Sequence, residues 1–203
     1  MKKAVFFDID GTLWDFKMNI PESTKKALKE LRKNGYYAFL CSGRSRSNIK
    51  SPKLLALGFD GIVAACGTHI EFGENLKSIT GTAQYEVNKL SAELGNADVE
   101  LVRKELGTEF DMIVHEPDGI LEIGQAGHSK ASGIERLCAS LGIAKEDTYA
   151  FGDSANDVEM LEFVAHGIAM GNGTDVAKNA AEFVTTDIHK DGIWNGLTHY
   201  GLI

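Results

Sequence analysis

The sequence predicts an α/β fold in which helices cover both faces of a doubly wound parallel sheet, with a small α+β cap inserted. Along most of the chain, short apolar runs of strand length alternate with amphipathic segments of helical length. Between residues 82 and 126 this alternation stops, and a charged helical stretch is followed by two strand-like runs. We therefore expect a core formed by residues 1–81 and 127–203 and a cap formed by residues 82–126.

The length and net charge of the chain limit the kinds of molecule that we expect it to bind. Its 203 residues fit one domain with a small insertion, since domains usually have about 100–200 residues. A formal net charge of −8 disfavours binding to nucleic acid or to an anionic membrane. A small phosphorylated substrate remains compatible, because a bound cation inverts the local field.

The sequence also predicts a cytoplasmic protein. The apolar run near the start ends at Asp8, which is too short for the ~7–15 apolar residues of a signal peptide. No stretch approaches the ~20 apolar residues that span a bilayer. The cysteines Cys41, Cys66 and Cys138 form no CxxC pair, and we expect free thiols in a reducing compartment.

The first half of the chain predicts three strands of the sheet and their connections. Pro21 suits a first helical turn, Leu28 and Leu31 share a helix face, and Gly35 suits a helix end. The expected elements are a strand at Ala4–Phe7, a helix at Pro21–Asn34, a strand at Tyr36–Cys41, a helix at Ser45–Leu57 interrupted near Pro52, a strand at Gly61–Ala65 and a short hairpin at His69–Ile79.

The second half repeats the alternation after the cap. We expect helices at Ser129–Leu141, Ala155–Val164, Asp175–Ala181 and Gly192–Tyr200, with strands at Thr148–Phe151, Gly167–Met170 and Phe183–Thr185. Right-handed crossovers between such strands give the doubly wound arrangement. Within the cap, we expect a helix at Asp98–Leu106 and a hairpin of Phe110–His115 and Ile120–Ile123.

Polar residues gather where the predicted strands end, which is where ligands bind in open α/β sheets. They are Asp8 and Asp10 after the first strand, Ser42, Gly43 and Arg44 after the second, Gly152, Asp153, Ser154, Asn156 and Asp157 after Thr148–Phe151, and Lys130 at a helix start. A carboxylate pair, a hydroxyl beside a glycine, a lysine and a second acidic cluster therefore share one edge of the sheet.

These groups fit phosphoryl transfer. Asp8 is the candidate nucleophile, since a carboxylate can form an aspartyl-phosphate. Neighbouring carboxylates require a cation, and Mg²⁺ is usually held by one or two carboxylates with phosphate and water. Asp8 and Asp153 would supply the carboxylates, and the Asp10 backbone carbonyl a further oxygen.

The remaining residues have complementary roles. Asp10 would protonate the leaving oxygen and then deprotonate the attacking water. The Ser42 hydroxyl, the Gly43 backbone N–H and the Lys130 ammonium would bind the phosphate oxygens.

Simpler roles remain open for several residues. Lys130 would be a solvated helix residue, and Asn156 and Asp157 would cap a helix. Trp14 and Phe16 would line a leaving-group pocket or pack under the cap.

Four motifs in this order resemble the haloacid dehalogenase (HAD) phosphatase superfamily and its Cof-type branch. They are Asp8-Ile9-Asp10-Gly11-Thr12, Ser42-Gly43-Arg44, Lys130 and Gly152-Asp153-Ser154-Ala155-Asn156-Asp157. The resemblance implies Asp8 as nucleophile, Asp10 as general acid/base, and Mg²⁺ at Asp8, Asp10 and Asp153 with Asp157 close by. It also implies phosphate on Ser42, Gly43 and Lys130, with Asn156 adjacent.

The chain departs from this pattern in two places. Its cap is shorter than the usual Cof-type cap, and Ala65-Cys66-Gly67 stands where many relatives read Ser-Asn-Gly. The resemblance implies a phosphatase for a small phosphate monoester, such as a sugar phosphate or phosphoglycolate, acting through an aspartyl-phosphate. Alternatives are a phosphomutase with the same nucleophile and a phosphate-binding homologue without turnover. A homo-oligomer that covers the site is a further expectation.

Overall fold

An eight-stranded sheet forms the centre of the molecule in the computed structural model, which describes residues 2–73, 77–78, 89–95, 98–115 and 119–203. The strand order is β11-β10-β9-β1-β2-β3-β4-β5, parallel from β11 to β3 and antiparallel at the β4–β5 hairpin. The strands are β1 (Ala4–Phe7), β2 (Tyr37–Cys41), β3 (Gly61–Ala64), β4 (His69–Phe72), β5 (Lys77–Ser78), β9 (Thr148–Gly152), β10 (His166–Ala169) and β11 (Phe183–Val184).

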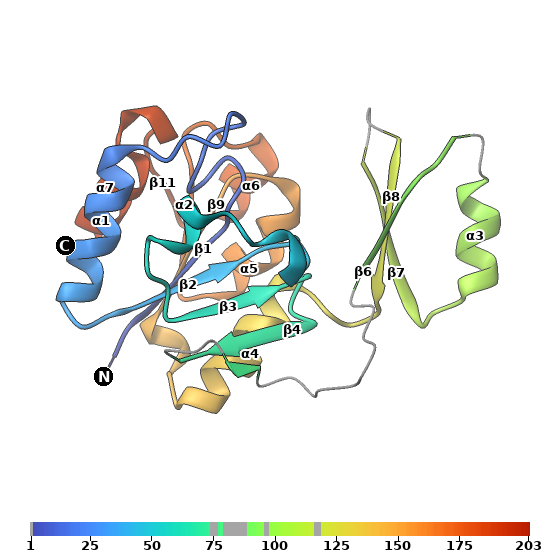
Figure 1. Ribbon diagram of the computed structural model, residues 1–203, viewed down its shortest axis with the longest axis horizontal. Helices are drawn as coiled ribbons and strands as arrows, with labels where there is room; N and C mark the ends of the chain where they lie inside the picture. Colours follow the sequence, from blue (N-terminus) through green and yellow to red (C-terminus); the bar gives the residue numbers. More distant parts are fainter. Residues whose placement is uncertain (1, 74–76, 79–88, 96–97, 116–118) are drawn as a thin grey trace.

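Helices cover both faces of this sheet, as Figure 1 shows. They are α1 (Glu22–Lys33), α2 (Pro52–Leu55), α4 (Lys130–Leu141), α5 (Val158–Phe163), α6 (Asp175–Ala180) and α7 (Gly192–His199). Val5 and Phe7 of β1 pack in one apolar cluster with residues of α1, α2 and α7. Ala4 and Phe6 pack in a second cluster with residues of α4, α5 and α6. The alternation of β1 side chains thus buries both faces, and the predicted doubly wound α/β fold is confirmed.

The strands predicted from apolar runs are confirmed to within one or two residues, but the segment after β2 differs from the prediction. Instead of a helix over Ser45–Leu57, a 3₁₀ turn at Arg46–Asn48 precedes the short helix α2. Pro52 is the first residue of α2, and Ser51 before it is extended, with φ −63° and ψ 120°. Proline disfavours helical backbone in the preceding residue, so it starts a helix here and does not interrupt one.

The predicted helix over Ala155–Val164 also begins differently. Residues Ala155–Asp157 form a 3₁₀ turn, and α5 follows at Val158–Phe163. The Asp157 carboxylate accepts hydrogen bonds from the backbone N–H groups of Asp153 and Ser154, at 2.9 and 3.0 Å. These bonds close a tight loop directly after β9, and the regular helix starts only beyond it.

A second, three-stranded sheet lies apart from the core, at the right of Figure 1. Its strands are β6 (Lys89–Glu93), β7 (Phe110–His115) and β8 (Ile120–Gln125), in the antiparallel order β6-β8-β7. The helix α3 (Val99–Leu106) starts at Asp98, whose carboxylate accepts from the N–H groups of Glu100 and Leu101. The predicted cap helix and hairpin are confirmed, and β6 is an additional strand. The cap boundaries at residues 82 and 126 stay a prediction, since residues 79–88 lie outside the described part.

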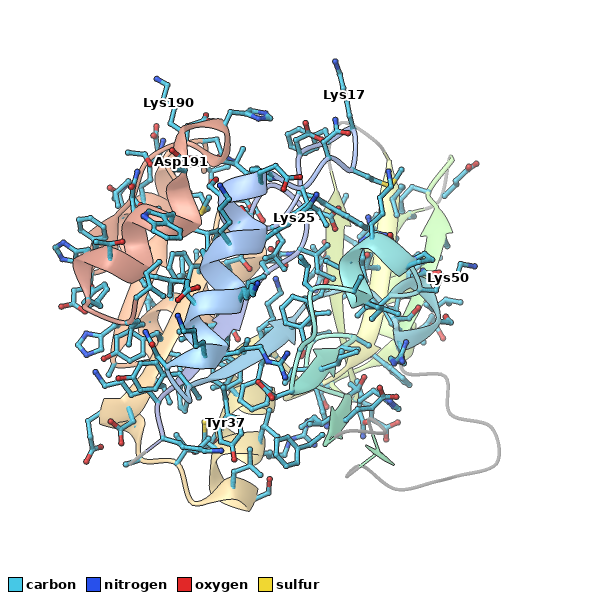
Figure 2. The ribbon with its side chains drawn as sticks, turned by 60° about the vertical axis from the view of Figure 1, so that its left-hand side comes forward. Lys17, Lys25, Tyr37, Lys50, Lys190 and Asp191 are labelled. Atoms are coloured by element: carbon cyan, nitrogen blue, oxygen red, sulfur yellow. The ribbon has the colours of Figure 1, made fainter. Side chains whose placement is uncertain are left out.

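Several lysine side chains extend from the surface. Figure 2 shows Lys17, Lys50 and Lys190 extending away from the chain, and all three are exposed. Among the described residues, no helix combines the length and the apolar character needed to cross a membrane.

Candidate active site

The predicted site residues follow three neighbouring strands at the centre of the sheet. The strand β1 lies between β9 and β2, and Phe7 pairs with both Phe151 and Leu40. The three strands therefore end almost level. From β1 the chain adds β2 and β3 on one side and β9, β10 and β11 on the other. Ligands of doubly wound folds bind at this kind of switch point.

Lys130 joins two buried carboxylates at this edge. Its Nζ lies 2.6 Å from Asp8 Oδ1 and 2.5 Å from Asp157 Oδ1, and the three residues are 1%, 5% and 0% exposed in that order. Ser129 caps α4 in a reciprocal pair with Ser132, so Lys130 is the first residue of a well-anchored helix. Lys130 is therefore not the solvated helix residue that the sequence left open as an alternative. Burial opposes the charge of Lys130, but Asp157 and Asp8 outweigh it and raise its pKa well above the usual value.

Asp8, Asp153 and Asp157 form a compact acidic cluster, with one oxygen of each lying within 4.8 Å of the others. Burial raises the pKa of Asp8 to about 7, against the opposing charge of Lys130. Burial, followed by repulsion from Asp157, raises the pKa of Asp153 to about 6. Buried carboxylates that repel one another favour a divalent cation, and their oxygens suit Mg²⁺. The residues present therefore fit the predicted cofactor.

The backbone at Gly11 brings the first loop against Asp153. Gly11 has φ +78°, and a Cβ at this position would lie 2.3 Å from Asp153 Oδ2. The Thr12 hydroxyl donates a hydrogen bond to Asp153 Oδ1 at 3.0 Å. Only glycine allows both this conformation and this approach, so Gly11 and Thr12 hold Asp153 close to Asp8.

Asp10 lies outside the acidic cluster. Its carboxylate accepts from Arg44 Nε at 2.6 Å, from Arg44 Nη2 at 2.8 Å and from Trp14 Nε1 at 2.8 Å. Burial alone would raise the pKa of Asp10, but the hydrogen bonds from Arg44 and Trp14 hold it below its usual value. The side chain is therefore ionised and turned towards the second loop. Its predicted metal contact through the backbone carbonyl stays a prediction.

A polar cavity of about 540 Å³ opens above these groups. Ser42, Gly43 and Asn156 line it, as predicted for phosphate-binding residues. A Cβ on Gly43 would lie 3.5–3.6 Å from Lys89 Nζ, Asn156 Nδ2 and Cys66 Sγ, which is an ordinary contact distance. Close packing thus does not require this glycine.

The cap supplies part of the same cavity. Lys89 and Ser91 of β6 and Glu122 of β8 line it. Lys89 Nζ donates to the Gly43 carbonyl at 3.0 Å and lies 2.5 Å from Glu122 Oε2. The two β6 residues are two apart and therefore point to the same face of their strand. The cap and the Ser42–Gly43 loop thus meet at the cavity that Asp8 also lines.

The structure brings most of the predicted site residues together. Asp8, Asp153, Asp157 and Lys130 are in contact or nearly so, and Ser42, Gly43 and Asn156 line the cavity above them. The sequence reasoning missed the Arg44–Asp10 pair, although Arg44 completes the Ser42-Gly43-Arg44 motif. It also missed Lys89 and Glu122, for which no sequence signal exists.

The two aromatic residues that follow Asp8 and Asp10 in the first loop have different environments. Trp14 is 3% exposed and packs in the core, where its indole N–H also binds Asp10. Phe16 is 93% exposed. Neither residue lines the catalytic cavity.

Comparisons with known proteins agree with this arrangement. The protein YkrA of Bacillus subtilis (strain 168) is 30% identical over 254 aligned positions, which cover 99% of this chain and 98% of YkrA. The alignment is longer than the 203 residues of this chain, so YkrA carries residues that this chain lacks. A phosphoglycolate phosphatase of Methanothermobacter thermautotrophicus (strain ATCC 29096 / DSM 1053 / JCM 10044 / NBRC 100330 / Delta H) is 25% identical over 210 positions, covering 94% of this chain and 95% of that protein.

A similar solved structure is that of the HAD subclass IIB sugar phosphatase BT4131. It has a TM-score of 0.86 and 25% identity, and the match covers 100% of both chains. A family model described as haloacid dehalogenase-like hydrolase matches residues 5–102 and 68–197 of this chain. The fold, the order of the motifs and these matches together show that the chain belongs to the haloacid dehalogenase-like hydrolase family.

Proposed function

We propose that this chain is a Mg²⁺-dependent phosphatase that hydrolyses a small phosphate monoester through an aspartyl-phosphate on Asp8. The observation that carries the proposal is the placement of the Asp8 carboxylate. It lies on the floor of a polar cavity, 2.6 Å from the ammonium of buried Lys130 and beside the Asp153–Asp157 carboxylates. A nucleophile, a fixed cation and a divalent-ion site meet at the position that a phosphate would occupy.

In the first step, an Asp8 oxygen attacks phosphorus while the bond from phosphorus to the leaving oxygen breaks. Asp10 gives its proton to that oxygen. This requires Asp10 to leave Arg44, whose hydrogen bonds keep its carboxylate ionised, and to take up a proton from the solvent. Mg²⁺ held by Asp8 and Asp153, with Asp157 close by, would offset the repulsion between the phosphate and Asp8.

In the second step, water attacks phosphorus and the bond to Asp8 breaks. The ionised Asp10 accepts the proton of this water. Lys130, the Ser42 hydroxyl and the Gly43 N–H would bind the phosphate oxygens in both steps, where charge is spread over three equatorial oxygens.

The cavity lining supports a polar leaving group. All twelve residues that line it among the described part are polar, charged or glycine. A hydroxylated carbon chain or sugar would find donors and acceptors on Lys89, Ser91 and Glu122, whereas an apolar group would desolvate them. The relatives named for phosphoglycolate and sugar phosphates agree with this class of substrate.

The test is hydrolysis of an aryl phosphate with and without Mg²⁺, beside Asp8→Asn and the control Asp175→Asn on exposed α6. We expect activity that requires Mg²⁺, is lost in Asp8→Asn and is unchanged in the control. Equal activity in Asp8→Asn, or none in the wild type, contradicts the proposal. Phosphoryl transfer to a substrate hydroxyl in place of water would indicate a phosphomutase.

A further inference from the structure

A second cavity, separate from the catalytic one, lies between α1 and the segment around α2. It has a volume of about 690 Å³ and shares no lining residue with the catalytic cavity. Its walls are residues 18–20 of the first loop, one face of α1, and the α2 segment. This volume falls within the roughly 300–1,000 Å³ of small-molecule sites.

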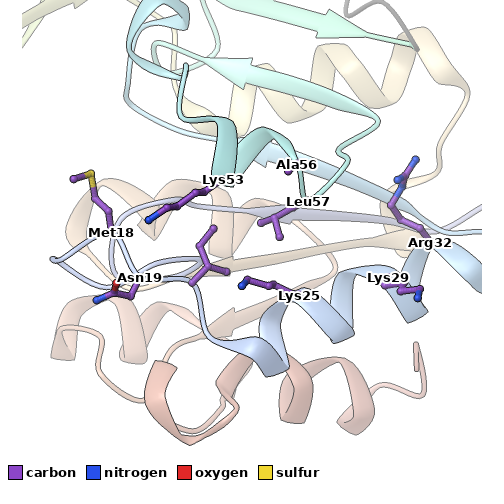
Figure 3. Close-up of a pocket in the computed structure, with 9 residues that line it drawn as sticks. Met18, Asn19, Lys25, Lys29, Arg32, Lys53, Ala56 and Leu57 are labelled. Carbon is purple, nitrogen blue, oxygen red and sulfur yellow. The ribbon is translucent and has the colours of Figure 1, made fainter.

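The lining combines basic and apolar side chains. Lys25, Lys29 and Arg32 come from α1 and Lys53 from α2, and none of the nine lining residues is acidic. Figure 3 shows the apolar Leu57 between Lys53 on one side and Lys25 and Lys29 on the other. In a chain with a net charge of −8, this grouping is a local reversal of charge.

The spacing of the basic residues places them in a row. Positions 25, 29 and 32 lie on one helix face, because residues three and four apart are neighbours on a helix. The row extends over about 10 Å, since a helix rises about 1.5 Å per residue. Lys53 faces the row from the opposite wall. A ligand with several separated negative groups would therefore meet several cations at once.

Two of these four cations form only weak ion pairs, and for the other two the described residues show none. Lys25 pairs with Glu22 and Arg32 with Asp60, at 2.5 and 3.4 Å, and the side chains of both cations are more than 40% exposed. Such surface pairs contribute little free energy and exchange readily. Within the described residues, Lys29 and Lys53 are in no ion pair.

We propose that this cavity binds a small organic polyanion, in which several phosphate groups are attached to an apolar or aromatic body. The phosphates would contact Lys25, Lys29, Arg32 and Lys53. The body would pack on the apolar side chains of Met18, Ile20 and Leu57, which also line the cavity. Nucleoside triphosphates have this chemistry. The site would be independent of the phosphatase centre.

The test is calorimetric titration of the full chain with adenosine triphosphate in EDTA, beside inorganic tripolyphosphate. EDTA prevents metal-dependent turnover. The test variant is Lys29→Glu with Lys53→Glu, and the matched control is Lys26→Glu with Lys50→Glu. Both control residues are exposed and lie outside the cavity lining, and Figure 2 shows Lys50 pointing away from the molecule. Circular dichroism and thermal melting establish that both double variants are folded.

We expect adenosine triphosphate to bind more tightly than tripolyphosphate, because only the former has a body for the apolar surface. The test variant should raise its Kd by at least about tenfold, and the control by less than about threefold, since removal of charge-assisted contacts acts locally. Added salt should weaken binding. In ¹⁵N-labelled protein, amide shifts should centre on residues 18–20 and 53–57.

The following results would overturn the proposal. They are no binding at millimolar adenosine triphosphate, equal loss of binding in the test and control variants, and amide shifts centred on Asp8, Ser42 and Lys130. Tripolyphosphate binding as tight as that of the nucleotide would also contradict it, because the apolar side chains would then contribute nothing.

Discussion

Lys130 is the residue on which the buried charges of the site depend. It neutralises Asp8 and Asp157, both of which are buried within 2.6 Å of its Nζ. When one partner of a buried ion pair is removed, the remaining charge is left without compensation, at a cost of about 3–5 kcal/mol.

We expect Lys130→Met to lower both stability and turnover. The free energy of unfolding should fall by about 3 kcal/mol or more by urea denaturation. The kcat for an aryl phosphate should fall by roughly 10²–10³, because a preorganised phosphate donor is lost. Lys145→Met, in an exposed 3₁₀ turn, is the control. A fall in kcat of less than about tenfold would count against the phosphate role.

Asp153 gives the metal-free protein a characteristic pH dependence. Its pKa is raised from the usual 3.8 to about 6 in the folded state. Between these values the folded state holds a proton that the unfolded state has lost. The contribution of Asp153 to the free energy of unfolding should therefore fall as the pH rises from about 4 to about 6, and it should stay constant above pH 6. The affinity for a metal ion should instead rise with pH, because metal binding requires the ionised carboxylate of Asp153.

We therefore expect Mg²⁺ to raise the melting temperature of the EDTA-treated protein more at pH 7.5 than at pH 5. Asp153→Asn should reduce the Mg²⁺ shift at pH 7.5 and leave only the pH dependence of Asp8, whose pKa of about 7 also lies in this range, and Asp147→Asn should keep the full difference. Thermal melting at the two pH values, with and without Mg²⁺, measures the effect. A Mg²⁺ shift that is the same at both pH values would show that Asp153 is not a ligand.

At the residue scale, motif spacing predicted the backbone positions of the site, but it did not predict the directions of the side chains. The sequence pattern predicts a position at the sheet edge for Asp8, Asp153 and Lys130, because each of them follows a strand or begins a helix. The Arg44–Asp10 pair could not be placed, because it depends on how two loops turn beyond their strands. Spacing determines the position of a backbone, whereas it leaves the rotamers of long side chains open.

Among the elements, the turn after β3 carries an unusual residue. Ala65 and Cys66 have φ +48° and +52°, and Gly67 N–H binds the Ala64 carbonyl at 3.0 Å. Two consecutive positive φ values in such a turn favour asparagine and glycine. Cys66 stands at the second of them, and burial raises the pKa of its thiol.

We expect Cys66→Asn to stabilise the protein by about 0.5–1 kcal/mol, because asparagine tolerates the left-handed conformation better. Cys66→Ala is the matched control, since it removes the thiol without favouring that conformation. Urea denaturation of the three proteins gives the comparison. A lower stability in Cys66→Asn than in Cys66→Ala would show that the turn conformation is not what limits this site.

The strand β6 connects the cap to the core through Lys89. Its ammonium binds both the Gly43 carbonyl and Glu122 and lines the cavity. We expect Lys89→Ala to lower kcat/KM for a sugar phosphate by about tenfold, mainly through KM, with a smaller effect on an aryl phosphate. Lys104→Ala, on exposed α3, serves as the control. Equal losses on both substrates would assign Lys89 to the phosphate and not to the leaving group.

The elements themselves were largely predictable, because the buried sheet consists of short apolar runs. The exceptions are the segment around α2, where Pro52 starts a helix, and β6. The strand β6 reads Lys-Leu-Ser-Ala-Glu, and most of its side chains are exposed. It exists because it pairs with β8, a tertiary contact that a local pattern does not reveal.

At the scale of the whole molecule, the site combines three separated parts of the chain at one switch point of the sheet. The proposed nucleophile Asp8 comes from the first ten residues, the Ser42–Gly43 loop from the following forty, and Lys130 and the acidic Asp153–Asp157 loop from beyond the cap. Three carboxylates of this acidic chain cluster at the sheet edge, where buried Lys130 offsets part of their charge and the proposed Mg²⁺ would offset more of it.

The most direct test of the proposed mechanism is to trap the phosphorylated enzyme. Asp10→Asn removes both the acid of the first step and the base that activates water. An aryl oxide leaves with little need of protonation, so the aspartyl-phosphate should still form from an aryl phosphate and then persist. After acid quenching with an aryl phosphate and Mg²⁺, mass spectrometry should find one phosphoryl group on the peptide that contains Asp8. The group should be absent without Mg²⁺ and in the Asp8→Asn/Asp10→Asn double variant. A phosphoryl group on another residue, or turnover without any covalent species, would contradict the mechanism.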